Sequence, residues 1–513
     1  MDPIMLTVAL AVLFVALIYH WATRNFNYWK DREIEFIPPV PFLGSIWSVL
    51  TLREHMGQFF WRMYDKYKGD HQFVGYFQSN SPGLIVTDPE LVRSIMIKDF
   101  SHFVDHGFEI DEEVDPMQSR NLFNMEGQKW KDMRSKLSPT FTSGKIKGLF
   151  PLVETCAKNF ENYMRDHQRE NINIKDLLAR YTTDIIGSCA FGLPVDSIKN
   201  PEDKFRVMGR KIFDIDLIQG LKNACIFFLP KVTKFFRFTF FPMEVTQFFR
   251  KLVKDIIDQR KKSGNTRKDF MQLLIQLKEH GKVAVEEGET EELETHEPSS
   301  IENLTDDDIV AQAVVFFIAG FETSSSMLTF GIMEMARHPD VQQRARDNIE
   351  EVLSRHGGKL SYQALQEMTY LDWIIQEALR MFPPLPIMNR VCTKNYVIPG
   401  TKTLMEKGTL VVIPTWAMQN DPKYFENPRD FYPDRYEDEN LLKNNFVYMP
   451  FGEGPRQCIG MRFAKMQSKL GLYSILRHFE ILESPKTAYP PVWDPKLFLL
   501  SATNDIFIQL KSI

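Results

Sequence analysis

The sequence of 513 residues predicts a mainly α protein with small β-sheets, in which a single large domain follows an N-terminal transmembrane anchor. Apolar residues recur at helical spacing over most of the chain, and only a few short stretches have the composition of strands. One long apolar stretch stands at the N-terminus, and no internal repeat or second domain boundary follows it. The predicted parts are an anchor over residues 1–21, a linker with a proline-rich hinge over 22–44, and a main domain over 45–513.

The N-terminal stretch "IMLTVALAVLFVALIYHW", Ile4 to Trp21, predicts an uncleaved membrane anchor. At about 1.5 Å per residue, a helix of this length crosses most of a bilayer core of about 30 Å. Asp2 precedes the stretch, whereas Arg24 and Lys30 follow it, which is unlike a signal peptide and keeps the following domain in the cytosol. The alternative is a buried helix, which seldom lies at the extreme terminus of a chain. The segment "IPPVPFLG" then forms a stiff spacer.

The overall charge and the cysteines narrow the class of protein. A net charge of −5 and a pI near 6.2 argue against nucleic acid as a partner. The five cysteines are odd in number and far apart, with no CxxC pair, so neither a disulfide framework nor a zinc site is indicated. This pattern suits a reducing compartment.

Strands are predicted in only two parts of the main domain. "HQFVGYF" and "GLIVT" form strands around the turn "QSNSPG", and "NYVIPG" with "GTLVVIP" indicates another small sheet later in the chain. The stretch over 286–297 is rich in glutamate and predicts a solvated loop that carries no chemistry.

The segment "LTDDDIVAQAVVFFIAGFETSSSMLTFGIMEMARHP" predicts one long core helix. Thr305 caps its start, and Asp308 three residues later completes a capping box. The stretch from Ile309 to Phe321 is apolar on nearly every face, so the helix passes through the core. A second membrane span is the alternative, but the polar residues from Glu322 onward end the apolar stretch too early for one.

The pentapeptide "AGFET" in the middle of this helix has two interpretations. A glycine weakens a helix by roughly 1 kcal/mol relative to alanine, and a buried carboxylate and hydroxyl need partners. In one interpretation Thr323 bonds back to a carbonyl and bends the helix, while Glu322 reaches solvent. In the other, a local groove holds a proton-donating acid–alcohol pair. The pentapeptide alone does not decide between them.

Two further motifs carry paired charges or donors. In "EALR", Glu377 and Arg380 are neighbours on one helix face, and Arg435 in "FYPDRY" supplies a second cation that can bridge Glu377. In "KWKDMR", Trp130 and Arg134 point the same way, and such donors suit a buried anion such as a carboxylate. Each motif in isolation also fits an exposed helix surface.

The sequence "FGEGPRQCIG" surrounds one cysteine with glycines, a proline and an arginine. A buried structural cysteine needs no such setting, whereas glycines let the backbone turn and approach a neighbouring group closely. The pattern Phe451-x-x-Gly454-x-Arg456-x-Cys458-x-Gly460 resembles the haem-binding loop of the cytochrome P-450 family. The "ET" pair, "ExxR", "PDRY" and the cysteine loop also follow one another in that family's order, and the resemblance extends from the anchor to the C-terminus.

Two longer stretches, "LSPTFTSGKIK" and "FFIAGFETSS", resemble the insect microsomal branch of the family, which is associated with detoxification. The resemblance implies a cytochrome P-450 fold with a single haem-thiolate catalytic domain. It also implies a monooxygenase that inserts one oxygen atom from O₂ into a hydrophobic small molecule. Insecticides, plant toxins, hormones and fatty acids all remain candidate substrates, because the sequence does not choose among them.

The resemblance assigns residues around a haem b. Cys458 would ligate the iron as a thiolate, and the amides of the flanking glycines, Gly460 among them, would tune the redox potential. Phe451 would pack near the sulfur side of the macrocycle. The two haem propionates would be bound by Trp130, Arg134, Arg390 and Arg456. Where relatives often carry a further arginine, this sequence has His106, so that contact is left open.

The resemblance also assigns catalytic and structural roles. Ala319 and Gly320 would form an oxygen groove, and Thr323, with Glu322 behind it, would help deliver protons. Glu377, Arg380 and Arg435 would form a structural ion network. Family position alone also places Leu385, Phe123 and Ile318 in the wall of the pocket, and each could equally belong to the ordinary core.

Electrons would come from NADPH through a separate flavoprotein, NADPH-cytochrome P-450 reductase, because the chain has no convincing flavin or nicotinamide motif. Cytochrome b5 is a further implied partner. Lys129, Lys131 and Lys136 would help to dock the acidic reductase, although a charge run is more often a solvated face. The implied location is the endoplasmic reticulum membrane, with the catalytic domain facing the cytosol.

Three alternatives belong to other classes of protein. A haem-thiolate isomerase or dehydratase would keep the cysteine loop but would not need Thr323. A non-enzymatic haem sensor would need neither an oxygen groove nor a reductase, and a transporter would need several membrane spans.

A separate expectation concerns "IFFLPKVTKFFRFTFFP", residues 226–242, whose aromatic and basic residues predict contact with the lipid interface near a substrate entrance. The alternative there is two helices that pack on the core.

Overall fold

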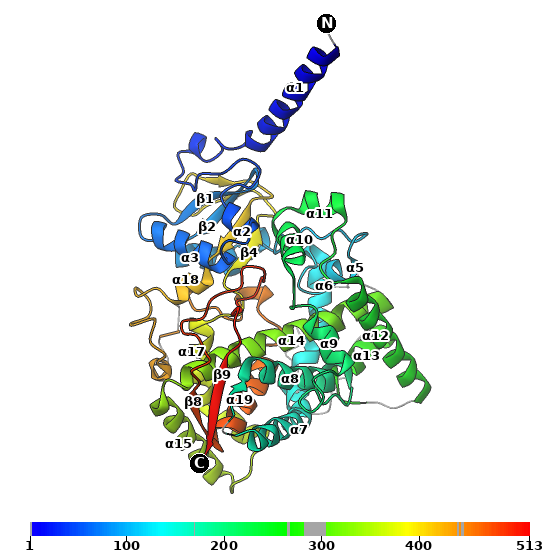
Figure 1. Ribbon diagram of the computed structural model, residues 1–513, viewed down its shortest axis with the longest axis vertical. Helices are drawn as coiled ribbons and strands as arrows, with labels where there is room; N and C mark the ends of the chain where they lie inside the picture. The colour runs from blue at the N-terminus through cyan, green and yellow to red at the C-terminus, as the bar shows by residue number, and fades with distance from the viewer. Residues whose placement is uncertain (1–2, 169, 264–266, 282–303, 439–440, 443–445) are drawn as a thin grey trace.

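The computed structural model describes residues 3–168, 170–263, 267–281, 304–438, 441–442 and 446–513, and it is mainly helical with small sheets, as predicted (Figure 1). The acidic stretch over 286–297 lies outside the described residues. The α-helices are α1 Pro3–Thr23, α2 Trp47–Leu50, α3 Met56–Tyr67, α4 Pro89–Arg93, α5 Pro116–Ser119, α6 Gly127–Leu137, α7 Ser143–Asp166, α8 Ile174–Ile186, α9 Lys204–Arg210, α10 Leu217–Phe228, α11 Pro230–Phe236, α12 Met243–Ser263, α13 Phe270–His280, α14 Asp306–Met335, α15 Pro339–Arg355, α16 Tyr362–Glu367, α17 Thr369–Met381, α18 Thr415–Gln419 and α19 Met461–Leu476. The strands are β1 Phe73–Gln78, β2 Ser81–Val86, β3 Ile172–Asn173, β4 Met388–Val391, β5 Tyr396–Val397, β6 Leu404–Met405, β7 Leu410–Ile413, β8 Phe479–Glu483 and β9 Phe507–Ser512.

The helix α14 crosses the middle of the molecule (Figure 1). Its predicted start is confirmed, since Thr305 and Asp308 form the capping box. It packs against α8, α12, α17 and α19, so most of its length is buried. At Gly320 the approach of α8 leaves no room for a side chain, because a Cβ there would lie 2.3 Å from Cδ1 of Ile186. The glycine therefore serves the packing of the two helices.

The β-hairpin predicted near the start of the main domain is present, and it belongs to a larger sheet than expected. β1 and β2 pair antiparallel, and the sheet order is β1-β2-β7-β4. The "GTLVVIP" strand, β7, was expected in a separate sheet, but it pairs parallel to β2. Only "NYVIPG" forms a separate pair, β5 with β6. A further sheet, β3-β9-β8, joins the C-terminus to the start of α8.

The segment between α1 and the main domain lies on the hairpin. The indole N–H of Trp29 donates to the Tyr76 carbonyl at 3.0 Å, and Trp29 is buried. Farther along, Gly44 takes a φ of 68°, and a Cβ there would lie 2.3 Å from the Phe77 carbonyl oxygen. The amide of Ile37 also donates to the Gly75 carbonyl. The predicted linker is thus in contact with β1 at several points.

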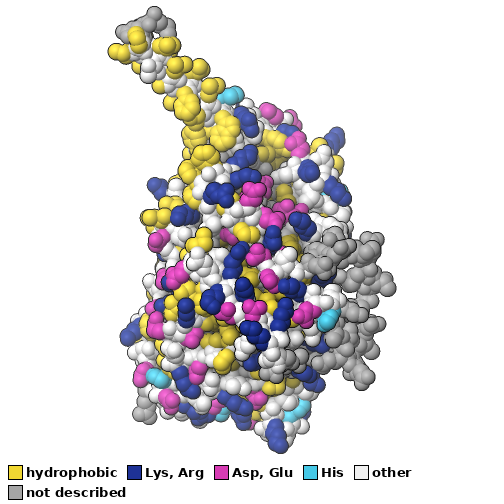
Figure 2. All heavy atoms as spheres, turned by 90° about the vertical axis from the view of Figure 1, so that its right-hand side faces the viewer, with side chains coloured by type: hydrophobic (Ala, Val, Ile, Leu, Met, Phe, Trp, Pro, Cys, Tyr) yellow, Lys and Arg dark blue, Asp and Glu magenta, His cyan; other side chains and the backbone are white. Residues whose placement is uncertain are grey.

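Apolar side chains are exposed at the end of the molecule that carries α1. The helix α1 is apolar enough to cross a membrane and projects from the body, as Figures 1 and 2 show. α10 and α11 lie toward the same end as the base of α1 (Figure 1). On them Leu217, Ile218, Phe235 and Phe236 are largely exposed. Over the rest of the face in Figure 2, basic and acidic side chains are interspersed.

Candidate functional site

An internal cavity of about 310 Å³ lies between α14 and the loop that precedes α19. Cys458 borders it, together with residues of α6 and of the segment that leads into β4. The accessible surface of Cys458 is large for a residue so far inside the protein, because that surface faces the cavity. The sulfur is therefore buried with respect to the outside but open to a ligand within the cavity.

The loop around Cys458 is shaped by its glycines. Gly452 and Gly454 take φ angles of 72° and 71°, in the left-handed region that favours glycine. A Cβ on Gly454 would lie 2.1 Å from the Met96 carbonyl oxygen, so the loop also needs the close approach. The Cys458 amide donates to the Phe451 carbonyl at 2.8 Å and closes the turn.

Gly460 differs from these two glycines, because a Cβ there would find only Phe141, at 4.0 Å. This glycine, which precedes α19, leaves space beside the cysteine at the cavity wall. Burial raises the pKa of the Cys458 thiol, while the Gly460 amide and the charge of Arg134 lower it. The protein alone does not stabilise a thiolate here, so a cation that binds the sulfur would have to supply the rest.

Three arginines line the cavity, and two of them have no acidic partner among the described residues. The buried Arg390 donates from Nη1 to the Asn389 carbonyl at 2.7 Å, and its Nε has no hydrogen-bond partner in the described part of the chain. Burial, together with the charge of Arg456, lowers the pKa of Arg390 to about 9. Arg134 makes no side-chain hydrogen bond or ion pair with any described residue. Buried cations of this kind are costly unless an anion compensates them, so the cavity suits a ligand with negative groups at this side.

Arg456 is in a different position, because the protein already satisfies most of its donors. It donates to the carbonyls of Val104 at 2.7 Å and Met125 at 2.6 Å, and its Nη2 lies 3.4 Å from the Asp105 carboxylate. Its guanidinium also lies 4.2 Å from the ring centroid of Trp130. Arg456 therefore fixes the cysteine loop to the segment over 104–125, and little of its donor capacity is left for a ligand.

His106 lies at the cavity wall beside these arginines. Its Nδ1 is 2.8 Å from the Phe123 carbonyl oxygen, which can only accept, so Nδ1 carries the proton. Burial and the charges of Arg390 and Arg456 hold the pKa of His106 well below its usual range. The imidazole is thus neutral at physiological pH, and its Nε2 is an acceptor.

The "AGFET" residues divide between the two sides of α14. Ala319, Gly320 and Thr323 line the cavity, and the Thr323 hydroxyl donates back to the Ala319 carbonyl. Glu322 is half-buried and lies outside the cavity wall, where it interacts with Lys175 and Arg206. Burial raises the pKa of Glu322, and the two cations oppose the rise. The structure thus contains the threonine back-bond of one interpretation and the partly buried acid of the other.

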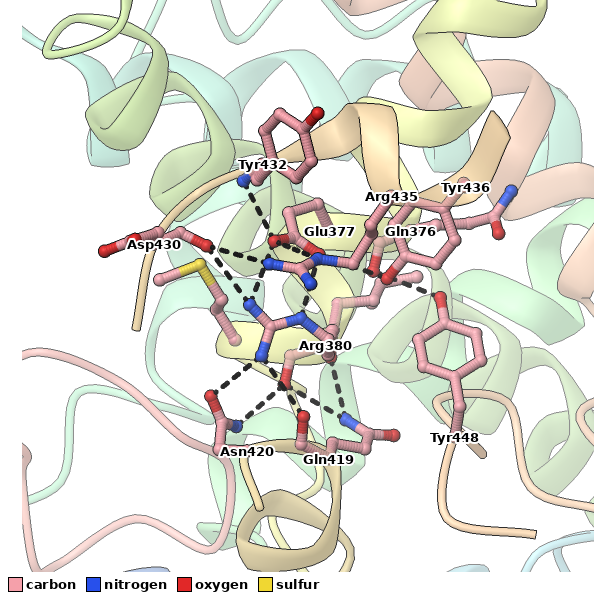
Figure 3. Close-up of polar contacts among 12 residues, drawn as sticks. Gln376, Glu377, Arg380, Gln419, Asn420, Asp430, Tyr432, Arg435, Tyr436 and Tyr448 are labelled. Atoms are coloured by element: carbon pink, nitrogen blue, oxygen red, sulfur yellow. Dashed lines mark hydrogen bonds and ion pairs between the residues drawn. The ribbon is translucent and has the colours of Figure 1, made fainter. Parts of the chain in front are cut away.

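The ion network predicted from "EALR" and "PDRY" is present (Figure 3). Arg380 binds both Glu377 oxygens, from Nε at 2.8 Å and from Nη2 at 2.9 Å. Arg435 Nε lies 3.0 Å from Glu377 Oε1, and the Tyr432 amide and the Tyr436 hydroxyl donate to the same carboxylate. Glu377 and Arg380 are fully buried.

This network reaches the cysteine loop through a residue that the sequence did not reveal. Gln419 donates to the Leu379 and Arg380 carbonyls and accepts the Met449 amide at 3.1 Å. Met449 lies two residues before Phe451 and lines the cavity. A buried glutamine at the end of a short helix has no distinctive sequence pattern, so its role becomes visible only in the structure.

The other predicted site residues lie as follows. Trp130, Arg134, Phe451, Gly460, Leu385 and Phe123 line the cavity with Cys458. For Ile318 the structure supports the second alternative, because this residue packs against the hydrophobic core and does not line the cavity. Phe108 and Phe498 line the cavity as well, although no sequence motif marked them.

Comparison with known proteins places these features in a family. A family model described as Cytochrome P450 matches residues 35–508. The relative "Cytochrome P450 6a2" of Drosophila melanogaster is 38% identical and covers 99% of each chain. "Cytochrome P450 6k1" of Blattella germanica is 37% identical over 97% of this chain and 95% of its own. "Cytochrome P450 9e2", from the same organism, is 38% identical over 98% of this chain and 97% of its own.

Proposed function

Because this chain belongs to the cytochrome P450 family, and is accordingly a haem-thiolate monooxygenase, we propose that it inserts one oxygen atom of O₂ into small hydrophobic molecules with electrons that originate from NADPH. One observation carries the assignment to these residues: Cys458 opens into an internal cavity whose wall also holds the buried Arg390 and the half-buried Arg134, neither with an acidic partner among the described residues. A flat, iron-containing group with two carboxylates fits such a wall. The candidate substrates are xenobiotics, such as insecticides or plant toxins, and endogenous lipids or hormones.

The residues of the cavity fit haem b. Cys458 would bind the iron through its sulfur, and the space beside Gly460 would admit the macrocycle next to it. Arg390 and Arg134, with the indole N–H of Trp130, would bind the propionates, and Arg456 would act mainly by holding the loop. Bound haem iron would supply the activation of O₂ and the transfer of electrons.

The protein's own contribution to proton transfer would come from α14. Thr323 would offer its hydroxyl within the cavity once that hydroxyl leaves the Ala319 carbonyl. Glu322, whose pKa is raised by burial, would hold a proton outside the cavity wall, close to Lys175 and Arg206. The largely apolar cavity wall would exclude bulk water from the reacting atoms.

Electrons would reach the site from the face that bears α6. Lys129 and Lys131 are exposed and Lys136 is half-buried on this helix, whose Trp130 and Arg134 line the cavity. A basic surface that close to the cavity suits an acidic flavoprotein, NADPH-cytochrome P-450 reductase, and cytochrome b5 would use the same face.

The protein would reside in the endoplasmic reticulum membrane, with its catalytic domain in the cytosol. α1 is unburied and has a mean hydropathy of 2.3, which suits a membrane span. Arg24 and Lys30 follow it, and basic residues favour the cytosolic side. The exposed apolar residues of α10 and α11 lie toward the same end and would contact lipid.

The assignment of Cys458 has a direct spectroscopic test. Reduced, CO-treated protein should show the red-shifted Soret band of a thiolate-ligated haem, and Cys458→Ala should abolish it. Cys392→Ala, at a buried cysteine that does not line the cavity, is the matched control and should keep the band. If Cys458→Ala retained the band, the ligand assignment would be wrong.

A further inference from the structure

A buried glutamine connects the helix that follows the cysteine loop with the "AGFET" segment. Gln467 is fully buried on α19, which begins just after Cys458. Its Nε2 donates to the Gly320 carbonyl at 3.1 Å and to the Ser324 hydroxyl at 2.6 Å. Gly320, Ser324 and Gln467 all line the cavity at Cys458. One side-chain amide thus joins α19 to the part of α14 that carries Thr323.

The orientation of this amide follows from its partners. The Gly320 carbonyl can only accept a hydrogen bond, so the NH₂ group of Gln467 must point toward it. The Oε1 atom then lies on the other side, where it has no hydrogen-bond partner in the described part of the chain. An unpaired buried oxygen costs free energy. Gln467 therefore contributes to the structure through its two donor contacts and not through its oxygen.

The helix α8 holds both ends of the connection. The Tyr181 hydroxyl donates to the backbone carbonyl of Gln467 at 2.9 Å, and Tyr181 is fully buried. On α14, a Cβ at Gly320 would lie 2.3 Å from Cδ1 of Ile186, so α8 also bounds the backbone there. Gly320 is thus confined by packing on one side and by the Gln467 amide at its carbonyl.

The contacts of Gln467 bear on the direction of the Thr323 hydroxyl. In an α-helix each carbonyl accepts the amide four residues later, so Gln467 supplies a second donor to the Gly320 carbonyl. Thr323 belongs to the turn between Gly320 and Ser324, and its hydroxyl donates back to the Ala319 carbonyl. A rotation of this turn would change where the Thr323 hydroxyl points within the cavity.

We propose that Gln467 is a positioning residue for the oxygen groove: by holding Gly320 and Ser324 it fixes the angle at which α14 presents Thr323 to the cavity. The inference rests on the proposed function, because the groove acts on a ligand of a haem bound at Cys458. The net contribution of one hydrogen bond corresponds to about a two- to tenfold change in an equilibrium. Loss of the amide should shift the arrangement of the turn by that order.

The test replaces Gln467 by an apolar side chain of similar length, Gln467→Met, in the full-length protein in detergent. The infrared stretching band of CO bound to the reduced protein is the first readout, because its frequency and width report the groups that surround the CO. In Gln467→Met this band should shift and broaden. The second readout is product formed per NADPH consumed, which should fall about two- to tenfold.

Gln342→Met is the matched control. Gln342 is also fully buried, and its Nε2 donates to a carbonyl of the same helix, that of Met335, at 2.7 Å. It does not line the cavity at Cys458. Gln342→Met should therefore leave the infrared band and the product ratio unchanged. If Gln467→Met binds no haem, Ser324→Ala, which removes one acceptor of the amide, is measured in its place by the same criterion.

The outcomes separate this inference from the proposed function. A parent without the red-shifted Soret band of its CO complex contradicts the function itself. With that band present, the positioning role is refuted by any of three results: an unchanged infrared band in the groove variant, an unchanged product ratio in that variant, or an equal change in Gln342→Met.

Discussion

Glu377→Ala should destabilise the whole protein and not only slow its chemistry. The Glu377 carboxylate is fully buried and accepts hydrogen bonds from Arg380, Arg435, Tyr432 and Tyr436. Its removal leaves two guanidinium groups close together without their counter-ion. Loss of one partner of a buried ion pair costs about 3–5 kcal/mol, and a folded protein is stable by only about 5–15 kcal/mol in total. Much of the stability should therefore be lost.

The matched control is a glutamate-to-alanine change in an ion pair that is exposed to solvent. Glu351 and Arg355 form an exposed ion pair on α15, with 3.7 Å between their charged atoms. Because exposed pairs contribute about 0–1 kcal/mol, Glu351→Ala should have little effect on the free energy of unfolding.

Urea denaturation followed by far-ultraviolet circular dichroism measures the difference, and the CO spectrum reports haem content in parallel. We expect Glu377→Ala to unfold at a much lower urea concentration and to lose haem, because Gln419 connects the network to the cysteine loop. A stable, haem-loaded Glu377→Ala protein with only slower turnover would refute the structural role.

Two further predictions concern oxygen and the membrane. Thr323→Ala should keep its haem but form less product per NADPH consumed, with more peroxide or water, because the cavity loses the hydroxyl that α14 places in it. A ratio of product to NADPH equal to that of the parent would exclude this role. Deletion of residues 1–21 should reduce membrane binding without abolishing it, since Phe235 and Phe236 remain exposed at the same end of the molecule. Replacement of Phe235, Phe236 and Phe238 by serine in the truncated protein should then release more of it in vesicle flotation, whereas complete release by the truncation alone would show that the anchor is the only membrane contact.

Features whose residues lie close together in the sequence were predictable from it. The capping box at Thr305 and Asp308 involves residues three apart, and the pair Glu377 and Arg380 lies on a single helix. The proline-bounded "PDRY" motif made it possible to predict Arg435 as a second cation for Glu377. The distance between the two side chains could not be predicted. The cysteine loop has the densest pattern, and two of its glycines, Gly452 and Gly454, take positive φ angles.

Features that depend on distant neighbours were not predictable. β7 has the pattern of any short strand, and its place beside β2 is decided by packing between segments more than 300 residues apart. The cations that Glu322 of α14 meets, Lys175 and Arg206, belong to α8 and α9, so the sequence around Glu322 does not indicate them. Likewise, nothing near Arg456 in the sequence indicates that the carbonyls of Val104 and Met125 occupy its donors.

The contact between the end of α1 and the β1–β2 hairpin has a consequence for how the protein stands on a bilayer. Asn80, in the hairpin turn, donates to the Trp21 carbonyl at 3.0 Å, and Asn25 donates to the Asn80 carbonyl at 2.9 Å. With Trp29 buried against the same sheet, the axis of the anchor and the catalytic body have little freedom to rotate independently. With α1 inserted in a bilayer as proposed, the tilt of the body and the height of its cavity above the lipid headgroups would follow from the tilt of this one helix. The thickness of the lipid bilayer influences that tilt. It would thereby affect how deeply α10 and α11 enter the membrane, and the depth in the bilayer from which a dissolved compound enters the protein.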